Sequence, residues 1–215
     1  MSYQTYWSYY GADLLLQFGQ HFEIVLLASL LGAIIGISAG VAVYRSPRAS
    51  QIALRVCGVL LTIPSLAMYV LLLSVIGLGW PPVLVALTLY SLLPIVQNTV
   101  VGLRGVNPAI LEAASGIGMS RARSVMRVEL PMAWPIILTG VRTSVLLLVS
   151  TATIGAIVRG PGLGNSIYDG LNRIGTPSAL YAALSGIAGV VIVGITLNFA
   201  FLFIGKLTTS RGIRD

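Results

Sequence analysis

The sequence predicts an all-α membrane protein whose chain crosses the bilayer five times. Of its 215 residues, 56% are hydrophobic and only 9% are charged, whereas a soluble domain carries about 25% charged residues. The hydrophobic residues also gather in runs close to the roughly 20 residues that a helix needs to cross a bilayer core. Because a backbone in lipid must satisfy its own hydrogen bonds, we expect each run to be a helix.

The five apolar runs are separated by shorter polar connections. They cover about residues 23–44, 56–77, 83–103, 135–158 and 180–204. Pro64 and Pro94 interrupt the second and third runs, and each predicts a kink, since proline removes a backbone hydrogen bond. Such a kink is either a bend that serves ordinary helix packing or a hinge or bend that lines a pore. Gly32, Gly36 and Gly40 form a row in the first run that permits close helix approach, within the chain or between chains.

The distribution of basic residues sets the expected orientation. Ten of them follow the first, third and fifth runs: Arg45, Arg48, Arg55, Arg104, Arg121, Arg123, Arg127, Lys206, Arg211 and Arg214. Arg159 and Arg173 lie on the other side. Because cytoplasmic loops are rich in Lys and Arg, we expect the N-terminus outside and the C-terminus in the cytoplasm. The expected organisation is an extracytoplasmic segment (1–21), a transmembrane domain (22–207, with a cytoplasmic connection at 104–134) and a cytoplasmic tail (208–215).

The positions of the charged residues also exclude several functions. All six acidic residues lie in connections or at the ends of runs, whereas carriers driven by protons or voltage place such groups inside the bilayer. Arg142 is the one charge well inside a run, where it could reach the interface, bond a neighbouring helix or line a path.

Catalytic and binding motifs of other kinds are missing from the sequence. It has no nucleophile elbow, metal-ligand spacing or phosphate-binding loop, which argues against an enzyme and against a resident cofactor or metal. The GPGLG stretch at 160–164 lacks the lysine of a phosphate-binding loop and is interpreted as turns. Nucleic-acid binding is not expected, because the basic residues form no single cluster.

The longest polar connection predicts two short helices joined by a glycine turn. Asn107 followed by Pro108 is typical of a helix start, and glycines ending at Gly118 would close that helix. Ser120 can cap a second helix, which we expect to stop before Pro131. Two such helices would form a compact knob that can press on a soluble partner.

This connection carries a spaced motif. EAA at 112–114 is followed after three residues by Gly118 and after nine more by VELP at 128–131. The pattern resembles the EAA signature of ABC importer permeases, in which isoleucine more often occupies the position of Val128. The resemblance covers roughly residues 20 to 205. It includes IPS at 63–65, LYSLLPIVQNTVVGLRGVNPAILEAA from 89, GVRTS from 140 and GPGLGNSIYDGL from 160, which are similar to permeases for osmoprotectants such as glycine betaine, choline and carnitine.

The resemblance implies a type I ABC importer permease fold in a bacterial cytoplasmic (inner) membrane. It also implies three protein partners besides membrane lipid: an ATP-binding cassette subunit dimer that binds the ATP, a second permease chain, identical or related, and an extracytoplasmic substrate-binding protein. The implied coupling residues are Glu112, Ala113, Ala114, Gly118, Leu130 and Pro131. The chain itself would not be an enzyme.

Residues of the substrate path are a weaker expectation. Quaternary ammonium groups are held by aromatic faces, so Tyr69, Tyr90 and Tyr168 are candidates together with Asn98, although each tyrosine is better explained by packing or an interfacial position. Two alternatives remain open: the same architecture importing another small solute such as an amino acid, or a non-transport membrane scaffold with a cytoplasmic hairpin. A secondary carrier ranks third.

Overall fold

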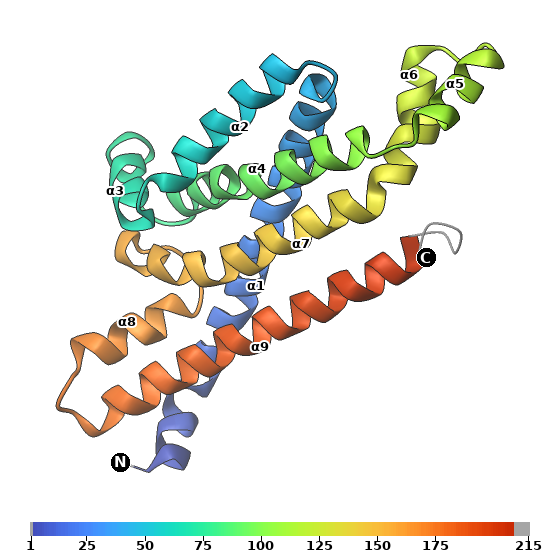
Figure 1. The fold of residues 1–215 in the computed structure, drawn as a ribbon. Helices are drawn as coiled ribbons and strands as arrows, with labels where there is room; N and C mark the ends of the chain where they lie inside the picture. The colour runs from blue at the N-terminus through green and yellow to red at the C-terminus, as the bar shows by residue number, and fades with distance from the viewer. Residues whose placement is uncertain (1, 209–215) are drawn as a thin grey trace.

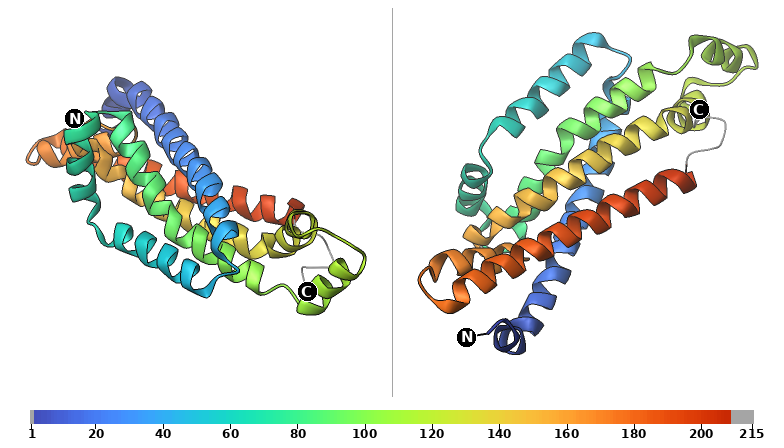
Figure 2. Two further views of the ribbon diagram at one scale, coloured as in Figure 1. Left: turned by 90° about the horizontal axis from the view of Figure 1, so that it is seen from above. Right: turned by 60° about the horizontal axis from the view of Figure 1, so that its bottom comes forward.

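The computed structural model describes residues 2–208, and its regular elements there are helices of three kinds. The α-helices are α1 (Tyr3–Val43), α2 (Pro47–Thr62), α3 (Ser65–Ile76), α4 (Trp80–Arg104), α5 (Pro108–Gly116), α6 (Arg121–Ser124), α7 (Leu130–Ile154), α8 (Gly164–Asn172) and α9 (Pro177–Thr208); η1 (Val125–Glu129) is a π-helix and η2 (Gly155–Val158) a 3₁₀-helix. The axes of the long helices α4, α7 and α9 lie roughly parallel, with the chain running in α7 opposite to α4 and α9, and α1 crosses them at an angle (Figures 1 and 2).

Four of the five apolar runs lie in helical segments long enough to span a membrane. These segments are residues 3–43, 80–104, 121–158 and 177–208. The second run is different, because α2 and α3 are bent by 93° at the break between them. The prediction of one kinked helix at residues 56–77 is therefore wrong. Ile63 is extended, as expected of a residue before proline, and the chain turns sharply instead of kinking.

The first helix is longer than the hydrophobic run indicated. It begins at Tyr3 instead of near Glu23 and continues to Val43 without a break. Tyr6 and Leu14 are buried where its first turns pack against α9, which gives these turns tertiary support. The boundary expected between residues 21 and 22 falls inside this helix, and the expected tail, apart from its first residue, lies outside the described residues.

The row of small residues in α1 packs against α4 of the same chain. Gly32, Gly36 and Gly40 are buried, and an added Cβ at Gly40 would lie 2.6 Å from Cβ of Thr99. Side chains at these positions would force the two helices apart. Of the two interpretations of the row, the structure therefore supports close approach within the chain.

The end of the bundle opposite the α5–α6 hairpin is closed by α8 and the turn before it. The GPGLG stretch forms this turn, as expected, with Gly162 at a φ of 106°. Nε2 of the fully buried His21 lies 3.0 Å from the carbonyl oxygen of Val149. Gln17 Oε1 accepts a 2.6 Å hydrogen bond from the Ser166 hydroxyl. These bonds fix α1 against α7 and α8.

Candidate functional site

The first helix of the predicted knob forms as the sequence indicated. Asn107 caps α5, its Oδ1 accepting a hydrogen bond from the Ala109 amide at 2.9 Å, and Pro108 occupies the first helical position. The helix ends at Gly116, and Gly118, in the turn that follows, has a φ of 78°. The Gly118 amide bonds the carbonyl of residue 115, and the Met119 amide bonds that of residue 114. This pair of bonds is the Schellman pattern, which needs a residue with positive φ.

The second helix of the knob does not stop before Pro131, so that prediction is wrong. The chain continues from α6 through η1 into α7 without leaving the helical path. The Leu130 amide bonds the carbonyl of Val125, five residues earlier. This wider turn comes directly before Pro131, whose ring would meet the carbonyl of residue 127 in a regular α-helix. Ser120 starts α6 but makes no capping bond through its side chain.

The predicted coupling residues divide between the tip and the base of this hairpin, which projects beyond the ends of α4 and α7 (Figure 1). Glu112 and Ala113 are exposed on α5, and Ala114 is buried against the rest of the hairpin. Gly118 is exposed at the turn. The remaining pair, Leu130 and Pro131, begins α7 at the base.

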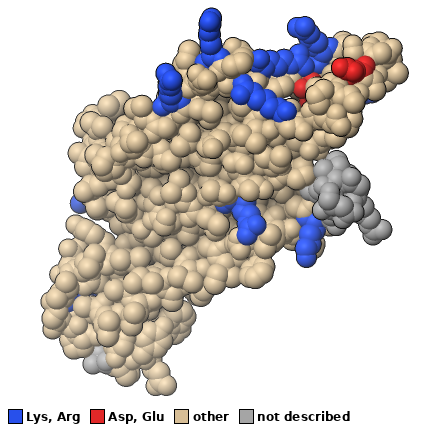
Figure 3. All heavy atoms as spheres, in the orientation of Figure 1, with Lys and Arg blue, Asp and Glu red and all other residues tan. Residues whose placement is uncertain are grey.

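Around these residues the hairpin exposes large apolar side chains. Ile117 is 78% exposed and Met126 is 69% exposed. Lys and Arg side chains gather along the edge of the molecule formed by α2 and the hairpin (Figure 3). The hairpin therefore offers apolar and small residues beside a basic surface, as a docking element for a soluble protein would.

A buried carboxylate at the base of the hairpin was missed by the sequence analysis. Glu129 is 1% exposed, and its Oε1 lies 2.9 Å from Nη2 of Arg45. Its Oε2 accepts a 2.6 Å hydrogen bond from the Tyr44 hydroxyl. The predicted coupling residues pass over position 129, although an acidic residue shortly before the fourth apolar run was a usable signal.

Two of the three tyrosines proposed for a substrate path lie around the break between α2 and α3. Tyr69 is fully buried and its hydroxyl donates to the Thr151 carbonyl at 3.0 Å. The Tyr90 hydroxyl donates to the carbonyl of Ile63 at 2.9 Å, which satisfies a backbone group freed by the break. Tyr90 also lines an open pocket of about 220 Å³ there.

The other two candidates lie elsewhere. Asn98 donates to the Pro94 carbonyl at 2.8 Å and lies against Gly140 of α7. Tyr168, on α8, is 43% exposed. The structure therefore brings only Tyr69 and Tyr90 together, and the assignment of all four to a path stays a prediction.

Arg142 bonds a neighbouring helix, one of the roles considered for it. Its Nε donates to Oδ1 of Asn198 on α9 at 2.8 Å. Arg142 also lines a cavity of about 190 Å³ between α7 and α9. This bond gives a partly buried charge inside the bundle a polar partner.

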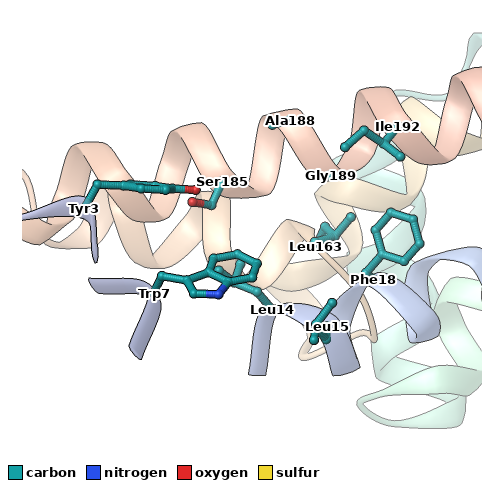
Figure 4. A pocket seen from close by; sticks show the side chains of 10 residues that line it. All are labelled: Tyr3, Trp7, Leu14, Leu15, Phe18, Leu163, Ser185, Ala188, Gly189 and Ile192. Carbon is teal, nitrogen blue, oxygen red and sulfur yellow. The ribbon is translucent and has the colours of Figure 1, made fainter. Parts of the chain in front are cut away.

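A second cavity, of about 290 Å³, lies between the N-terminal halves of α1 and α9. It is mostly apolar, and its walls include Tyr3, Trp7 and Phe18 from α1 and Ser185 and Ile192 from α9 (Figure 4). Within residues 2–208, no three His, Cys, Asp or Glu side chains are placed to hold a metal ion. We find no arrangement for covalent or acid–base chemistry in this cavity.

Comparison with known proteins identifies the family. The family described as binding-protein-dependent transport system inner membrane component matches residues 32–211. The glycine betaine/carnitine/choline transport system permease protein OpuCB of Bacillus subtilis is 35% identical, over 95% of this chain and 92% of its own. The carnitine transport permease protein OpuCB of Listeria monocytogenes is 34% identical, over 98% and 95% of the two chains.

Solved structures agree on the fold. A chain of the inward-facing MetNI methionine ABC transporter superposes with a TM-score of 0.78 at 21% identity, over 92% of this chain and 96% of its own. At that identity the likeness concerns the fold alone. From the family match and the identity to its permeases, the chain belongs to the inner membrane components of binding-protein-dependent transport systems.

Proposed function

We propose that this chain is the permease subunit of an ATP-driven importer for quaternary ammonium osmoprotectants of the glycine betaine, choline and carnitine class. The observation that carries the proposal is the α5–α6 hairpin, which leaves Glu112 and Ala113 exposed and continues through η1 into α7. The names of the relatives supply the substrate class. The chain crosses the inner membrane five times, α2 and α3 counting as one crossing, with its N-terminus outside.

In this mechanism a partner binds and hydrolyses ATP. The chain converts the partner's motion into a change in which side of the membrane the solute path is open to. Closure of an ATPase dimer pushes the hairpins of two permease chains, and each push acts on α7 because no break separates α6 from α7. The long helices then reorient around a path between the two chains. An extracytoplasmic binding protein delivers the substrate to the outer face.

The function is tested by uptake in a bacterial strain that lacks its own osmoprotectant importers. The chain is expressed with its ATPase and binding protein, and uptake of labelled glycine betaine, choline, carnitine and methionine is measured. We expect uptake of one or more of the first three, and none with an ATPase that cannot hydrolyse ATP. Uptake of methionine alone would favour another solute, and unchanged uptake with the inactive ATPase would refute an ATP-driven importer.

The hairpin assignment has its own test. The double variant Glu112→Lys/Gly118→Trp should reach the membrane, retain little of the ATPase on purification and lose uptake. A matched control, Glu23→Lys/Gly19→Trp, makes the same changes at exposed positions of α1. Equal loss in both double variants, or normal uptake in the first, would contradict the assignment.

A further inference from the structure

Glu129 joins the hairpin to the end of α1 through both oxygens of its carboxylate. Oε2 accepts from the Tyr44 hydroxyl at 2.6 Å, and Oε1 accepts from Arg45 at 2.9 Å. Ser124, the last residue of α6, donates a longer bond of 3.3 Å to Oε1. The carboxylate therefore binds α6 on one side and the two residues that follow α1 on the other.

The hydrogen bonds around Glu129 and Tyr44 extend to α4 and α2 through Arg104. Nε of Arg104, the last residue of α4, donates to the carbonyl oxygen of Tyr44 at 2.7 Å. Its Nη2 donates to the hydroxyl of Ser50 on α2, also at 2.7 Å. The ends of α1, α2 and α4 are thus joined to one another, and Glu129 joins the hairpin to all three.

Besides these bonds, Val125 of η1 packs against the apolar cluster that includes Tyr44 and Leu103, and few other contacts link the hairpin to these helices. Helix α5 packs mainly on α6 and η1. A cleft of about 400 Å³ separates it from the bundle, with Pro108 and Leu111 on the hairpin side and Tyr44 and Arg104 on the bundle side. The cleft leaves room for the hairpin to move, while Glu129 remains attached.

The chemistry of this attachment differs from that of ordinary packing. Apolar contacts are non-directional and allow surfaces to slide, whereas hydrogen bonds weaken steeply with distance and angle. A buried carboxylate that loses its partners is also strongly destabilised. When η1 moves, the groups bonded to Glu129 must therefore move with it.

We propose that Glu129 is a positioning residue that passes displacement of the hairpin to α1 and α4, in addition to the direct route through α7. This inference rests on the proposed function, in which the hairpin receives motion from an ATPase. It assigns the carboxylate to the coupling of ATP hydrolysis to transport, not to substrate binding or to assembly with the ATPase.

The test uses the whole importer in proteoliposomes, with the chain carrying Glu129→Gln. Three quantities are measured: the ATPase that co-purifies, the rate of ATP hydrolysis and the uptake of glycine betaine. Glutamine keeps the shape but loses the charge that pairs with Arg45. We expect normal co-purification and a fall of about tenfold in uptake per ATP hydrolysed, which lies within the usual range of coupling between sites. The matched control Glu23→Gln removes an exposed acid of α1 and should leave the uptake per ATP hydrolysed unchanged.

The outcomes separate this inference from the proposed function. If the unmodified importer shows no ATP-dependent uptake, the proposed function fails. If it does, and Glu129→Gln lowers uptake and hydrolysis by the same factor or leaves both unchanged, only the role of Glu129 is overturned. If Glu129→Gln does not reach the membrane, Tyr44→Phe decides, because it removes one hydroxyl and keeps the ion pair. An unchanged ratio in Tyr44→Phe would then overturn the inference.

Discussion

Replacing Gly40 by alanine tests whether the contact between α1 and α4 depends on the absence of a side chain. An ideal Cβ at this position lies 2.6 Å from both Cβ and Cγ2 of Thr99, whereas carbon atoms in contact normally lie about 3.5–4.0 Å apart. Thr99 cannot turn aside, since one of the two atoms is its own Cβ. The helices must therefore separate locally by about 1 Å.

The magnitude follows from two opposing effects. Overpacking a close contact costs about 1–3 kcal/mol, and removing a glycine from a helix interior returns about 0.5–1 kcal/mol. The expected net destabilisation of Gly40→Ala is the difference of these ranges, which is centred on about 1.3 kcal/mol. At roughly 2–4 °C per kcal/mol for a chain of this size, the midpoint of thermal unfolding should fall by about 2.5–5 °C.

The assay is thermal unfolding of the purified protein in one detergent and at one scan rate. Gly19→Ala is the matched control, because it lies in the same helix and an added Cβ there meets nothing within 4 Å. Its midpoint should stay the same or rise. If Gly40→Ala unfolds at the same temperature as Gly19→Ala or above it, the close approach of α1 and α4 is not what stabilises this contact.

Three other substitutions probe single interactions, each by thermal unfolding unless stated. Tyr69→Phe removes a donor to a backbone carbonyl and should cost about 1 kcal/mol, whereas Tyr168→Phe, at an exposed position, should have no effect. Asn198→Leu leaves the charge of Arg142 without its partner and should cost about 1.5–3 kcal/mol, which adding Arg142→Met should partly restore. Gly118→Ala forces a side chain to a φ of 78° and should cost about 1–2 kcal/mol, seen as faster hydrogen exchange in α5; unchanged exchange would argue against strain.

The helices and the first half of the hairpin follow from local patterns. Apolar runs marked the four helical segments that are long enough to span a membrane, because burial in lipid demands length and hydrophobicity of each helix separately. The cap at Asn107 and the turn at Gly118 were also readable, since each depends on backbone groups a few residues away. The motif from Glu112 to Pro131 pointed to the family that the comparisons then identified.

Other features depend on residues far apart in the sequence. Pro64 indicated a kink, but the 93° turn also needs Tyr90 to satisfy the carbonyl that the break exposes. The helix was expected to end before Pro131, yet a π-helical turn carries it into α7.

The pairing at the base of the hairpin is the clearest case. Glu129 and Arg45 are 84 residues apart, and the sequence around either residue gives no indication that the two side chains pair. The sequence alone determined that this is a membrane protein of apolar helices with a capped hairpin, because those properties are local. Only the tertiary structure decided that the Glu129 carboxylate of the hairpin pairs with Arg45 of the bundle, because this pairing depends on how closely α1 packs on α4.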